Sequence, residues 1–220
     1  MAVFQLDSAR VLVVGDSHCC AGFGRRLFWN LSHAGARVEM YGAIASTSIH
    51  WLEGLTPSGQ VCRHWIPEFA SHAELTFYED TVPLPRMETL LRTKAYDLVV
   101  IALGTNSLAD PEFSSSHSDL AQIVSDYADC LWIGPPHLRP DQAGRGESSE
   151  RVAALEGRLN DFLDCLGRGL RPKCFLIDSR PATIRGAPGG ETIDGIHRTR
   201  TAGMAWADVL ARQMKALLGE

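Results

Sequence analysis

Runs of apolar residues that end in small polar turns recur along the chain. Residues 11–14 read Val-Leu-Val-Val and end at Gly15-Asp16-Ser17, and the apolar run over 98–103 ends at Gly104-Thr105-Asn106. Continuous apolar runs of this length are typical of strands that are buried on both faces. Shorter runs of the same kind cover residues 37–41, 131–133 and 174–177. The pattern therefore predicts five strands.

Segments with helical spacing of apolar residues separate these runs, at 25–31, 118–130, 150–167 and 199–218. The apolar residues of 150–167 fall on one stripe, which predicts a single long amphipathic helix. Alternation of strands and helices predicts a parallel sheet that is covered on both faces. We expect an α/β fold, a three-layer α/β/α sandwich, with a five-stranded, mostly parallel sheet in the flavodoxin-like order 2-1-3-4-5.

Residues 49–94 depart from this alternation, because aromatic residues and prolines such as Pro57, Pro67 and Pro83 break the pattern. The length of 220 residues suits one α/β domain. We therefore predict a single domain over 1–220, in which residues 49–94 are an insertion over the sheet that contains a short hairpin or turns.

The composition excludes several classes of protein. The hydrophobic fraction of 45% supports a substantial core, and the net charge of −5 argues against a nucleic-acid partner, which needs a basic face. No apolar run is long enough to predict a membrane span, and residues 1–7 lack the features of a signal peptide. A cytoplasmic location is the default expectation. A leader removed during maturation would leave the same sequence, so a periplasmic or secreted location stays open, as does the oligomeric state.

The cysteines carry a second indication of compartment. They are Cys19, Cys20, Cys62, Cys130, Cys165 and Cys174. None forms a C-x-x-C pair, and several adjoin apolar segments, which predicts reduced, buried thiols and favours the cytosol. Cys19 lies close enough to Ser17 to be an alternative nucleophile. His50, His64 and His137 lack the spacing of metal ligands, so we expect no metal and no cofactor.

Polar residues follow the predicted strands at positions that suit acyl transfer. Ser17, the small-residue loop 42–48 and Asn106 each follow a strand, and Asp194 and His197 precede the last helix. Carboxyl ends of parallel strands share one edge of a sheet, so these groups can converge. A serine nucleophile needs a base, and an imidazole needs a carboxylate to orient it. The alternative for Ser17 is a helix N-cap.

Three motifs, Gly15-Asp16-Ser17, Gly104-Thr105-Asn106 and Asp194-Gly195-Ile196-His197, resemble blocks I, III and V of the SGNH (GDSL-type) hydrolases. The resemblance spans nearly the whole chain. It implies a three-layer α/β/α domain and serine-dependent hydrolysis of esters without a metal or cofactor. By motif position, it implies Ser17 as nucleophile, His197 as base, Asp194 as the orienting acid and Asn106 as an oxyanion donor.

Two positions depart from the family pattern. Block II normally supplies a glycine whose N–H completes the oxyanion hole, and here Ala45 stands at that position, followed by Ser46. We predict that the N–H groups of Ala45 and Ser17 and the amide of Asn106 form the oxyanion hole. Block III normally ends in Asn-Asp, whereas Ser107 follows Asn106 here. The candidate substrate-lining residues are Asp16, His18, Ser46 and Trp51.

The leading hypothesis is a serine esterase that removes a short acyl group, most naturally O-acetyl, from a carbohydrate through an acyl-enzyme. The acetyl group and the carbohydrate come from the range of the family. One alternative is an acyltransferase with the same triad, in which a sugar hydroxyl replaces water. Another is a non-catalytic flavodoxin-like module that binds a nucleotide or phosphate at residues 15–24, which leaves Asp194 and His197 without a role. The expected partner is a small-molecule or glycan ester.

Overall fold

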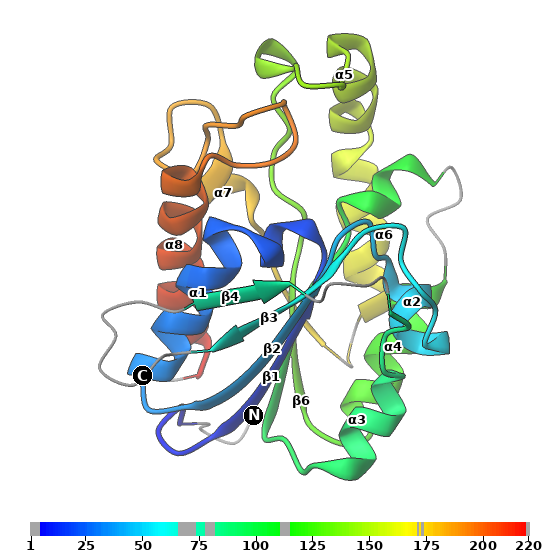
Figure 1. Ribbon diagram of the computed structural model, residues 1–220, viewed down its shortest axis with the longest axis vertical. Helices are drawn as coiled ribbons and strands as arrows, with labels where there is room; N and C mark the ends of the chain where they lie inside the picture. The colour runs from blue at the N-terminus through cyan, green and yellow to red at the C-terminus, as the bar shows by residue number, and fades with distance from the viewer. Residues whose placement is uncertain are drawn as a thin grey trace.

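The computed structural model describes residues 5–65, 74–77, 82–110, 115–170, 172 and 174–218. Its centre is a seven-stranded sheet in the order β4-β3-β2-β1-β5-β6-β7 (Figure 1). The strands are β1 (Arg10–Gly15), β2 (Arg37–Ala43), β3 (Val61–Trp65), β4 (Glu74–Phe77), β5 (Leu98–Ala102), β6 (Asp129–Ile133) and β7 (Phe175–Ile177).

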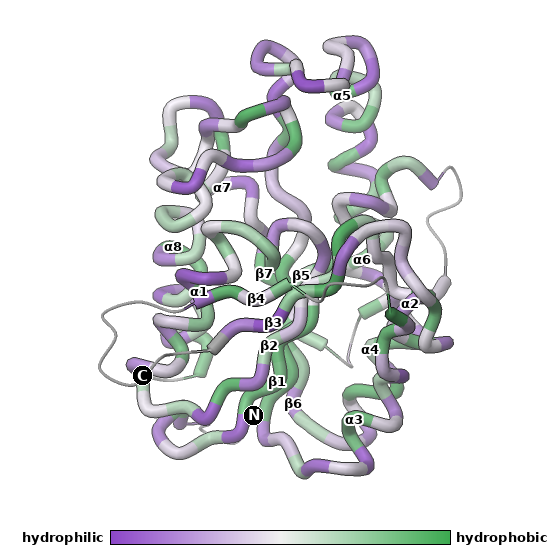
Figure 2. The backbone as a smooth tube through the Cα atoms, viewed as in Figure 1, coloured by the Kyte–Doolittle hydropathy of each residue, from purple (hydrophilic) through white to green (hydrophobic). Residues whose placement is uncertain are grey.

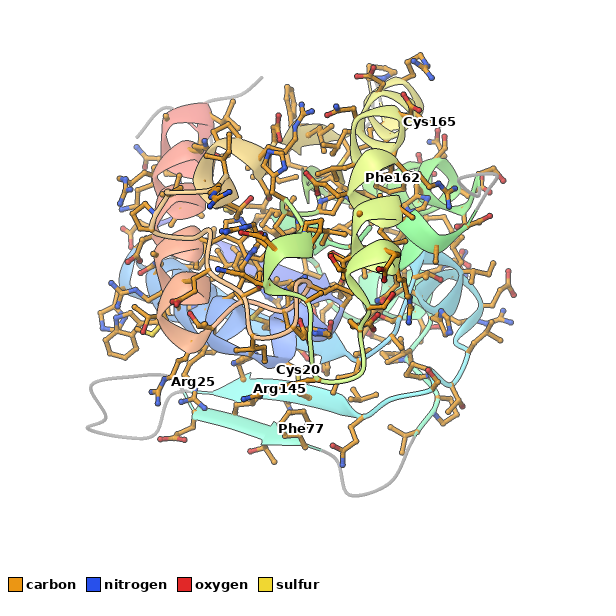
Figure 3. All side chains as sticks on the ribbon, turned by 90° about the horizontal axis from the view of Figure 1, so that it is seen from above. Cys20, Arg25, Phe77, Arg145, Phe162 and Cys165 are labelled. Carbon is orange, nitrogen blue, oxygen red and sulfur yellow. A yellow bond between two sulfur atoms is a disulfide. The ribbon has the colours of Figure 1, made fainter. Side chains whose placement is uncertain are left out.

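The sheet contains two kinds of strand pairing. The strands β2-β1-β5-β6-β7 run parallel, in the order that the alternation of strands and helices predicts. The prediction of a five-stranded sheet is nevertheless wrong, because β3 and β4 add an antiparallel hairpin beyond β2. Both strands come from the segment 49–94, which extends the sheet by hydrogen bonding to the edge of β2 that would otherwise be unpaired. Viewed from above, this hairpin, with Phe77, forms one outer edge of the molecule (Figure 3).

Helices cover both faces of the sheet (Figure 1). One face is covered by α1 (Gly22–His33) and α8 (Arg200–Leu218), and the other by α2 (Ser48–Glu53), α3 (Met87–Thr93), α4 (Ser116–Ser125) and α6 (Leu159–Leu170). Side chains alternate along β1, so Val11 and Val13 pack into the first core while Leu12 and Val14 pack into the second. Hydrophobic residues accordingly concentrate in the central strands (Figure 2). The expected arrangement of an α/β sheet between helical layers is confirmed.

The predicted helix over 150–167 is two helices, α5 (Ser149–Gly157) and α6. Arg158 separates them, and its side chain donates to the backbone carbonyl of Asp110. Buried residues on both sides, such as Val152 and Phe162, join the same core, so the apolar stripe was correct although the helix is interrupted. The remaining helices are η1 (Ser17–Cys20), η2 (Asn106–Ala109), η3 (Pro140–Gln142) and α7 (Arg180–Thr183). In the ranges that the structure describes, no helix is both long and apolar enough to cross a bilayer.

Two disulfides overturn the prediction of reduced cysteines. Cys20 is bonded to Cys62 across 42 residues of sequence, and Cys130 to Cys174 across 44. The partners meet only after folding, since one pair needs β3 beside β2 and the other needs β7 beside β6. Spacing along the chain therefore carried no signal for either bond. Cys19 and Cys165 remain free thiols.

Candidate active site

The strand register brings three polar turns to one edge of the sheet. Gly15 of β1 pairs with Gly42 of β2 on one side and with Ala102 of β5 on the other, so these strands end at the same level. The turns that follow carry Ser17, Ala45 and Asn106, as the strand pattern predicts.

Ser46 connects these three turns. Its backbone carbonyl accepts a hydrogen bond from the side-chain amide of Asn106 at 3.0 Å. Its hydroxyl, which is fully buried, donates to the backbone carbonyl of Gly15 at 3.4 Å. The positions of the nucleophile turn, the Ala45 turn and the Asn106 turn are therefore linked by hydrogen bonds.

The hydroxyl of Ser17 points to His197 rather than capping its own helix. The N-cap of η1 is Asp16, whose carboxylate accepts from the N–H of His18 at 3.0 Å. Ser17 Oγ lies 3.0 Å from His197 Nε2. The alternative in which Ser17 serves only as a cap is thus wrong, because Asp16 already fills that role.

Asp194 and His197 form the other half of the site, on the loop before α8. His197 Nδ1 donates to Asp194 Oδ2 at 2.7 Å, which leaves Nε2 as the acceptor for the hydroxyl of Ser17. Asp194 Oδ1 accepts from the N–H groups of Ile196 and His197 at 2.9 and 2.7 Å. Between them, Gly195 has φ +90°, and a Cβ there would lie 2.9 Å from a backbone oxygen.

The environment keeps the carboxyl group of Asp194 ionised. Burial alone would raise its pKa, but hydrogen bonds from the His197 side chain and from the N–H groups of His197 and Ile196 outweigh burial. The pKa of Asp194 therefore lies below its ordinary value. An ionised carboxylate here orients the imidazole and stabilises its protonated form.

The three predicted oxyanion donors are N–H groups on the turns that Ser46 links. The amide nitrogen of Asn106 uses one N–H for Ser46, which leaves its second N–H available. Within the described residues, no acceptor binds the N–H of Ser17 or of Ala45. Ala45 has φ +64°, in the left-handed region that favours glycine. An alanine thus occupies a position whose backbone conformation is that of a glycine.

The four candidate substrate-lining side chains are all buried: Asp16 is 2% exposed, His18 3%, Ser46 0% and Trp51 0%. Trp51 belongs to the core under α2, so the prediction that it lines a substrate surface is wrong. The His18 ring packs edge-on against the Trp206 ring, with centroids 5.3 Å apart. Burial, followed by the charges of His197 and Arg198, lowers the pKa of His18 well below its ordinary value. The neutral ring supports the site from inside the fold.

Burial also determines the state of Asp16 and Cys19. It raises the pKa of Asp16 to about 6, although hydrogen bonds from His18 and Thr105 oppose it. Burial, with the charge of Asp16, raises the pKa of the Cys19 thiol well above its ordinary value. Because Cys19 is 0% exposed and stays protonated, it is a packing residue rather than the alternative nucleophile.

Two supporting residues had no signal in the sequence. Arg198 is 5% exposed, and its guanidinium donates to the backbone carbonyls of His137 and Gly190, which anchors the loop that carries His197. Burial lowers the pKa of Arg198 to about 10. His64 contacts the turn of Ser17 from β3, where its ring nitrogen Nε2 is hydrogen-bonded to the backbone oxygen of Cys19.

No group of three or more His, Cys, Asp or Glu side chains in the described ranges is arranged as metal ligands.

The fold is that of the SGNH hydrolases. A protein assigned as an SGNH hydrolase from Slackia heliotrinireducens superposes with a TM-score of 0.63 at 18% identity, over 94% of this chain and 100% of its own. A peptidoglycan O-acetylesterase superposes with a TM-score of 0.60 at 14% identity, over 98% and 93% of the two chains. A GDSL-like lipase from Bacteroides thetaiotaomicron has a TM-score of 0.51 at 13% identity, over 96% and 88%.

Sequence comparison adds one relative. Protein BcsX of Komagataeibacter xylinus is 23% identical over 220 aligned residues, which cover 94% of this chain and 77% of that protein. No model of a protein family matches the sequence. The resemblance to SGNH hydrolases that the three motifs indicate is thus confirmed by the fold.

Proposed function

We propose that this protein is a serine esterase that hydrolyses a short-chain ester, an O-acetyl group on a carbohydrate, through an acyl-enzyme. The observation that carries the proposal is the series of hydrogen bonds from Ser17 Oγ through His197 to Asp194, with distances of 3.0 and 2.7 Å. A nucleophile, a base and an orienting carboxylate in this geometry define serine hydrolysis on unrelated folds.

In the first half-reaction, Ser17 Oγ attacks the acyl carbon and its proton passes to His197 Nε2. The negative charge that forms on the acyl oxygen is bound by the N–H groups of Ser17 and Ala45 and by the free N–H of Asn106. Collapse of the tetrahedral intermediate breaks the ester bond, and His197 returns the proton to the leaving alkoxide. Asp194 holds the imidazole in the required tautomer throughout.

In the second half-reaction, a water molecule gives its proton to His197 Nε2 and attacks the acyl carbon. The acid is released when the proton returns to Ser17. A sugar hydroxyl in place of water would make the same groups an acyltransferase, so the two activities differ only in the acceptor.

The substrate class draws support from one comparison. A structure with the same fold, at a TM-score of 0.60, is that of a peptidoglycan O-acetylesterase. The loop that carries the proposed donor Ala45 also consists of small residues, Ala45 and Ser46 among them. We assign a small acyl group on a carbohydrate on this basis.

The decisive test compares Ser17→Ala with Ser32→Ala, a serine on α1 outside the site. We expect Ser17→Ala to lower kcat on p-nitrophenyl acetate by at least about 10⁴-fold and to abolish labelling by a fluorophosphonate, because residual catalysis comes only from binding and the oxyanion donors. Ser32→Ala should match the wild type. Full turnover in Ser17→Ala would overturn the proposal, and acetate release from an O-acetylated glycan, with and without a second glycan acceptor, separates hydrolysis from transfer.

The two disulfides support an oxidising compartment for this protein instead of the cytosol, since structural disulfides persist in such compartments. This replaces the cytoplasmic default.

A further inference from the structure

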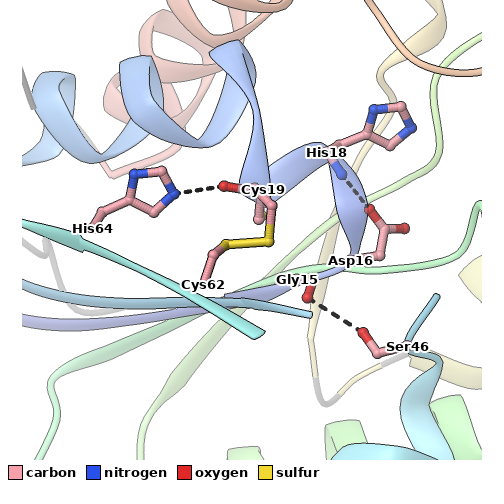
Figure 4. The surroundings of a disulfide bond; sticks show 8 residues. Gly15, Asp16, His18, Cys19, Ser46, Cys62 and His64 are labelled. Atoms are coloured by element: carbon pink, nitrogen blue, oxygen red, sulfur yellow. Dashed lines mark hydrogen bonds between the residues drawn. A yellow bond between two sulfur atoms is a disulfide. The ribbon is translucent and has the colours of Figure 1, made fainter. Parts of the chain in front are cut away.

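The antiparallel strand β3 is attached to the turn of Ser17 at two points. Cys62 and His64 are two positions apart on β3, so their side chains project from the same face of the strand. Cys62 forms the disulfide with Cys20, and His64 Nε2 lies 2.5 Å from the backbone oxygen of Cys19 (Figure 4). Both attachments reach the last two residues of η1, Cys19 and Cys20, in the same short helix as Ser17.

The turn that carries Ser17 has few bonds of its own. Four residues form η1, with backbone bonds from Cys19 to Asp16 and from Ala21 to His18. Asp16 fixes its beginning, where the carboxylate accepts from the N–H of His18. The other end is held from outside by β3, so the strand completes the support of the turn.

The disulfide and His64 fit this location closely. A Cβ on Gly42 would lie 2.6 Å from Cys62 Sγ and 2.7 Å from Cys20 Sγ, so the bond packs directly on the backbone of β2. His64 is 3% exposed, and burial lowers its pKa to about 4, so the ring is neutral at pH 7. Because its partner is a carbonyl oxygen, Nε2 carries the proton and donates it.

We propose that Cys20, Cys62 and His64 are positioning residues for the nucleophile, and that full turnover requires the Cys20–Cys62 disulfide. This inference rests on the proposed esterase function. A dithiol reductant would supply two electrons and two protons, the S–S bond would break, Cys20 and Cys62 would become thiols, and the dithiol would become a disulfide. The turn would then lose its covalent attachment to β3, and Ser17 Oγ would no longer be held at its distance from His197.

The second disulfide provides a matched control. Cys130 and Cys174 close a loop of nearly the same length, 44 residues of sequence against 42. This bond connects the beginning of β6 to the residue before β7, at the ends of the strands opposite to Ser17. Removal of either disulfide should lower stability similarly, because loop length governs the entropic contribution. Only the first should change the chemistry.

The experiment compares two double variants, Cys20→Ala/Cys62→Ala and Cys130→Ala/Cys174→Ala. Both partners are replaced because free Cys19, adjacent to Cys20, could pair with a lone Cys62. The measurements are kcat and KM on p-nitrophenyl acetate and the rate of fluorophosphonate labelling at Ser17. They are made at a temperature where near-ultraviolet circular dichroism shows that all proteins are folded.

We expect the Cys20→Ala/Cys62→Ala variant to lose about 10- to 100-fold in kcat and labelling rate with little change in KM, since small displacements of a reacting atom have effects of this size. The second pair should keep wild-type kcat.

Two further variants test His64 with the disulfide intact, and so remain informative if the first pair fails to fold. His64→Leu removes the donor and should lower kcat without raising KM, while His64→Gln keeps an N–H donor and should restore part of the loss. Equal kcat in both disulfide pairs, or wild-type kcat in His64→Leu, overturns the inference. A wild-type protein that neither cleaves the ester nor reacts with the probe overturns the proposed function, and this inference with it.

Discussion

The nucleophile turn and the histidine loop each hold one buried carboxylate, and they hold it in opposite states. On the histidine loop, hydrogen bonds from His197 and Ile196 outweigh burial and keep the pKa of Asp194 below its ordinary value. On the nucleophile turn, burial dominates and raises the pKa of Asp16 to about 6. Both carboxylates accept hydrogen bonds from backbone N–H groups, so the presence of such bonds does not by itself explain the difference.

The difference follows from depth and partner. Asp16, between β1 and η1, is 2% exposed, and Asp194 is 8% exposed with the His197 imidazole bonded to one of its oxygens. Hydrogen bonds donated by His197 and Ile196 stabilise the charge of Asp194, whereas burial disfavours the charge of Asp16 more than its hydrogen bonds favour it. The comparison predicts that Asp194 acts in the chemistry and Asp16 in the stability of the turn.

The largest expected effect is on the histidine loop. Asp194→Asn should lower kcat by about 10⁴-fold, because an amide favours the wrong tautomer of the imidazole. Asp16→Asn, the same chemical change on the other loop, should keep most of the activity. Steady-state kcat on p-nitrophenyl acetate measures both, and equal losses in the two variants would break the distinction between the loops.

The next effect belongs to the Asn106 turn, which carries the side-chain amide that we propose as an oxyanion donor. Asn106→Ala should lower kcat by about 10²–10³-fold, the loss typical of one such donor. Ser107→Ala is the control, because the Ser107 hydroxyl contacts His117 at 3.1 Å rather than the site. Turnover equal in the two variants would show that the nucleophile turn and Ala45 bind the oxyanion without Asn106.

The third effect is a pH-dependent change in stability at Asp16. Its folded pKa of about 6 lies above the ordinary 3.8, so the folded state favours the protonated form. The free-energy cost of burying the ionised carboxylate, which destabilises the folded state, is absent below pH 4, grows between pH 4 and 6, and is complete above pH 6. The stability of Asp16→Asn relative to wild type should therefore rise by about 3 kcal/mol between pH 4 and 7.

Urea unfolding at several pH values measures this change as a difference between the two proteins, so that other titrating groups cancel. Asp194→Asn should show a change of opposite sign and at lower pH, because the lowered pKa of Asp194 stabilises the folded state above its ordinary value of 3.8 and that contribution is lost only as the pH falls below 3.8. Parallel pH profiles for wild type and Asp16→Asn would contradict the assignment of Asp16.

The smallest effect concerns Ala45, the strained alanine on the turn that Ser46 links to the nucleophile turn. Ala45 has φ +64°, so Ala45→Gly should raise the free energy of unfolding by roughly 0.5–1 kcal/mol, the relief of left-handed strain less the entropy of glycine. Its kcat should match the wild type, since the N–H is kept. Ala34, with φ −82°, is the matched control, and Ala34→Gly should lower stability. A loss of stability in Ala45→Gly would contradict the strained conformation.

Local patterns were sufficient for the parallel part of the fold and for the motif residues. The buried runs of β1 and β5 and their polar turns are continuous in sequence, and parallel strands place their carboxyl ends at one edge. For this reason Ser17, Asn106, Asp194 and His197 could be selected together before any coordinates. Hydrogen bonds confirm that Ser17, His197 and Asp194 converge, and Asn106 is linked to the turn of Ser17 through Ser46, while the roles of all four residues remain proposals.

Other features depended on contacts between distant segments. The side chain of Arg158, at the break between α5 and α6, bonds to a carbonyl 48 residues away, and the hairpin pairs with the edge of β2. The burial of Trp51, which removed it from the substrate surface, depends on how α2 packs on the sheet. These contacts join residues far apart in the sequence, so no hydrophobic periodicity predicts them.

Contacts between distant segments also determine which cysteines pair and in which direction the pKa values of the two carboxylates shift. Apolar neighbours indicated that the cysteines are buried, but pairing required segments 42 and 44 residues apart to meet at bonding distance. The residue types Asp16 and Asp194 were visible in the sequence, yet the opposite shifts of their pKa values arise from desolvation and from the partners that surround each group. Solvent exclusion and long-range contacts exist only in the folded chain, so residue type and spacing select the candidates and the packed structure assigns each one its state.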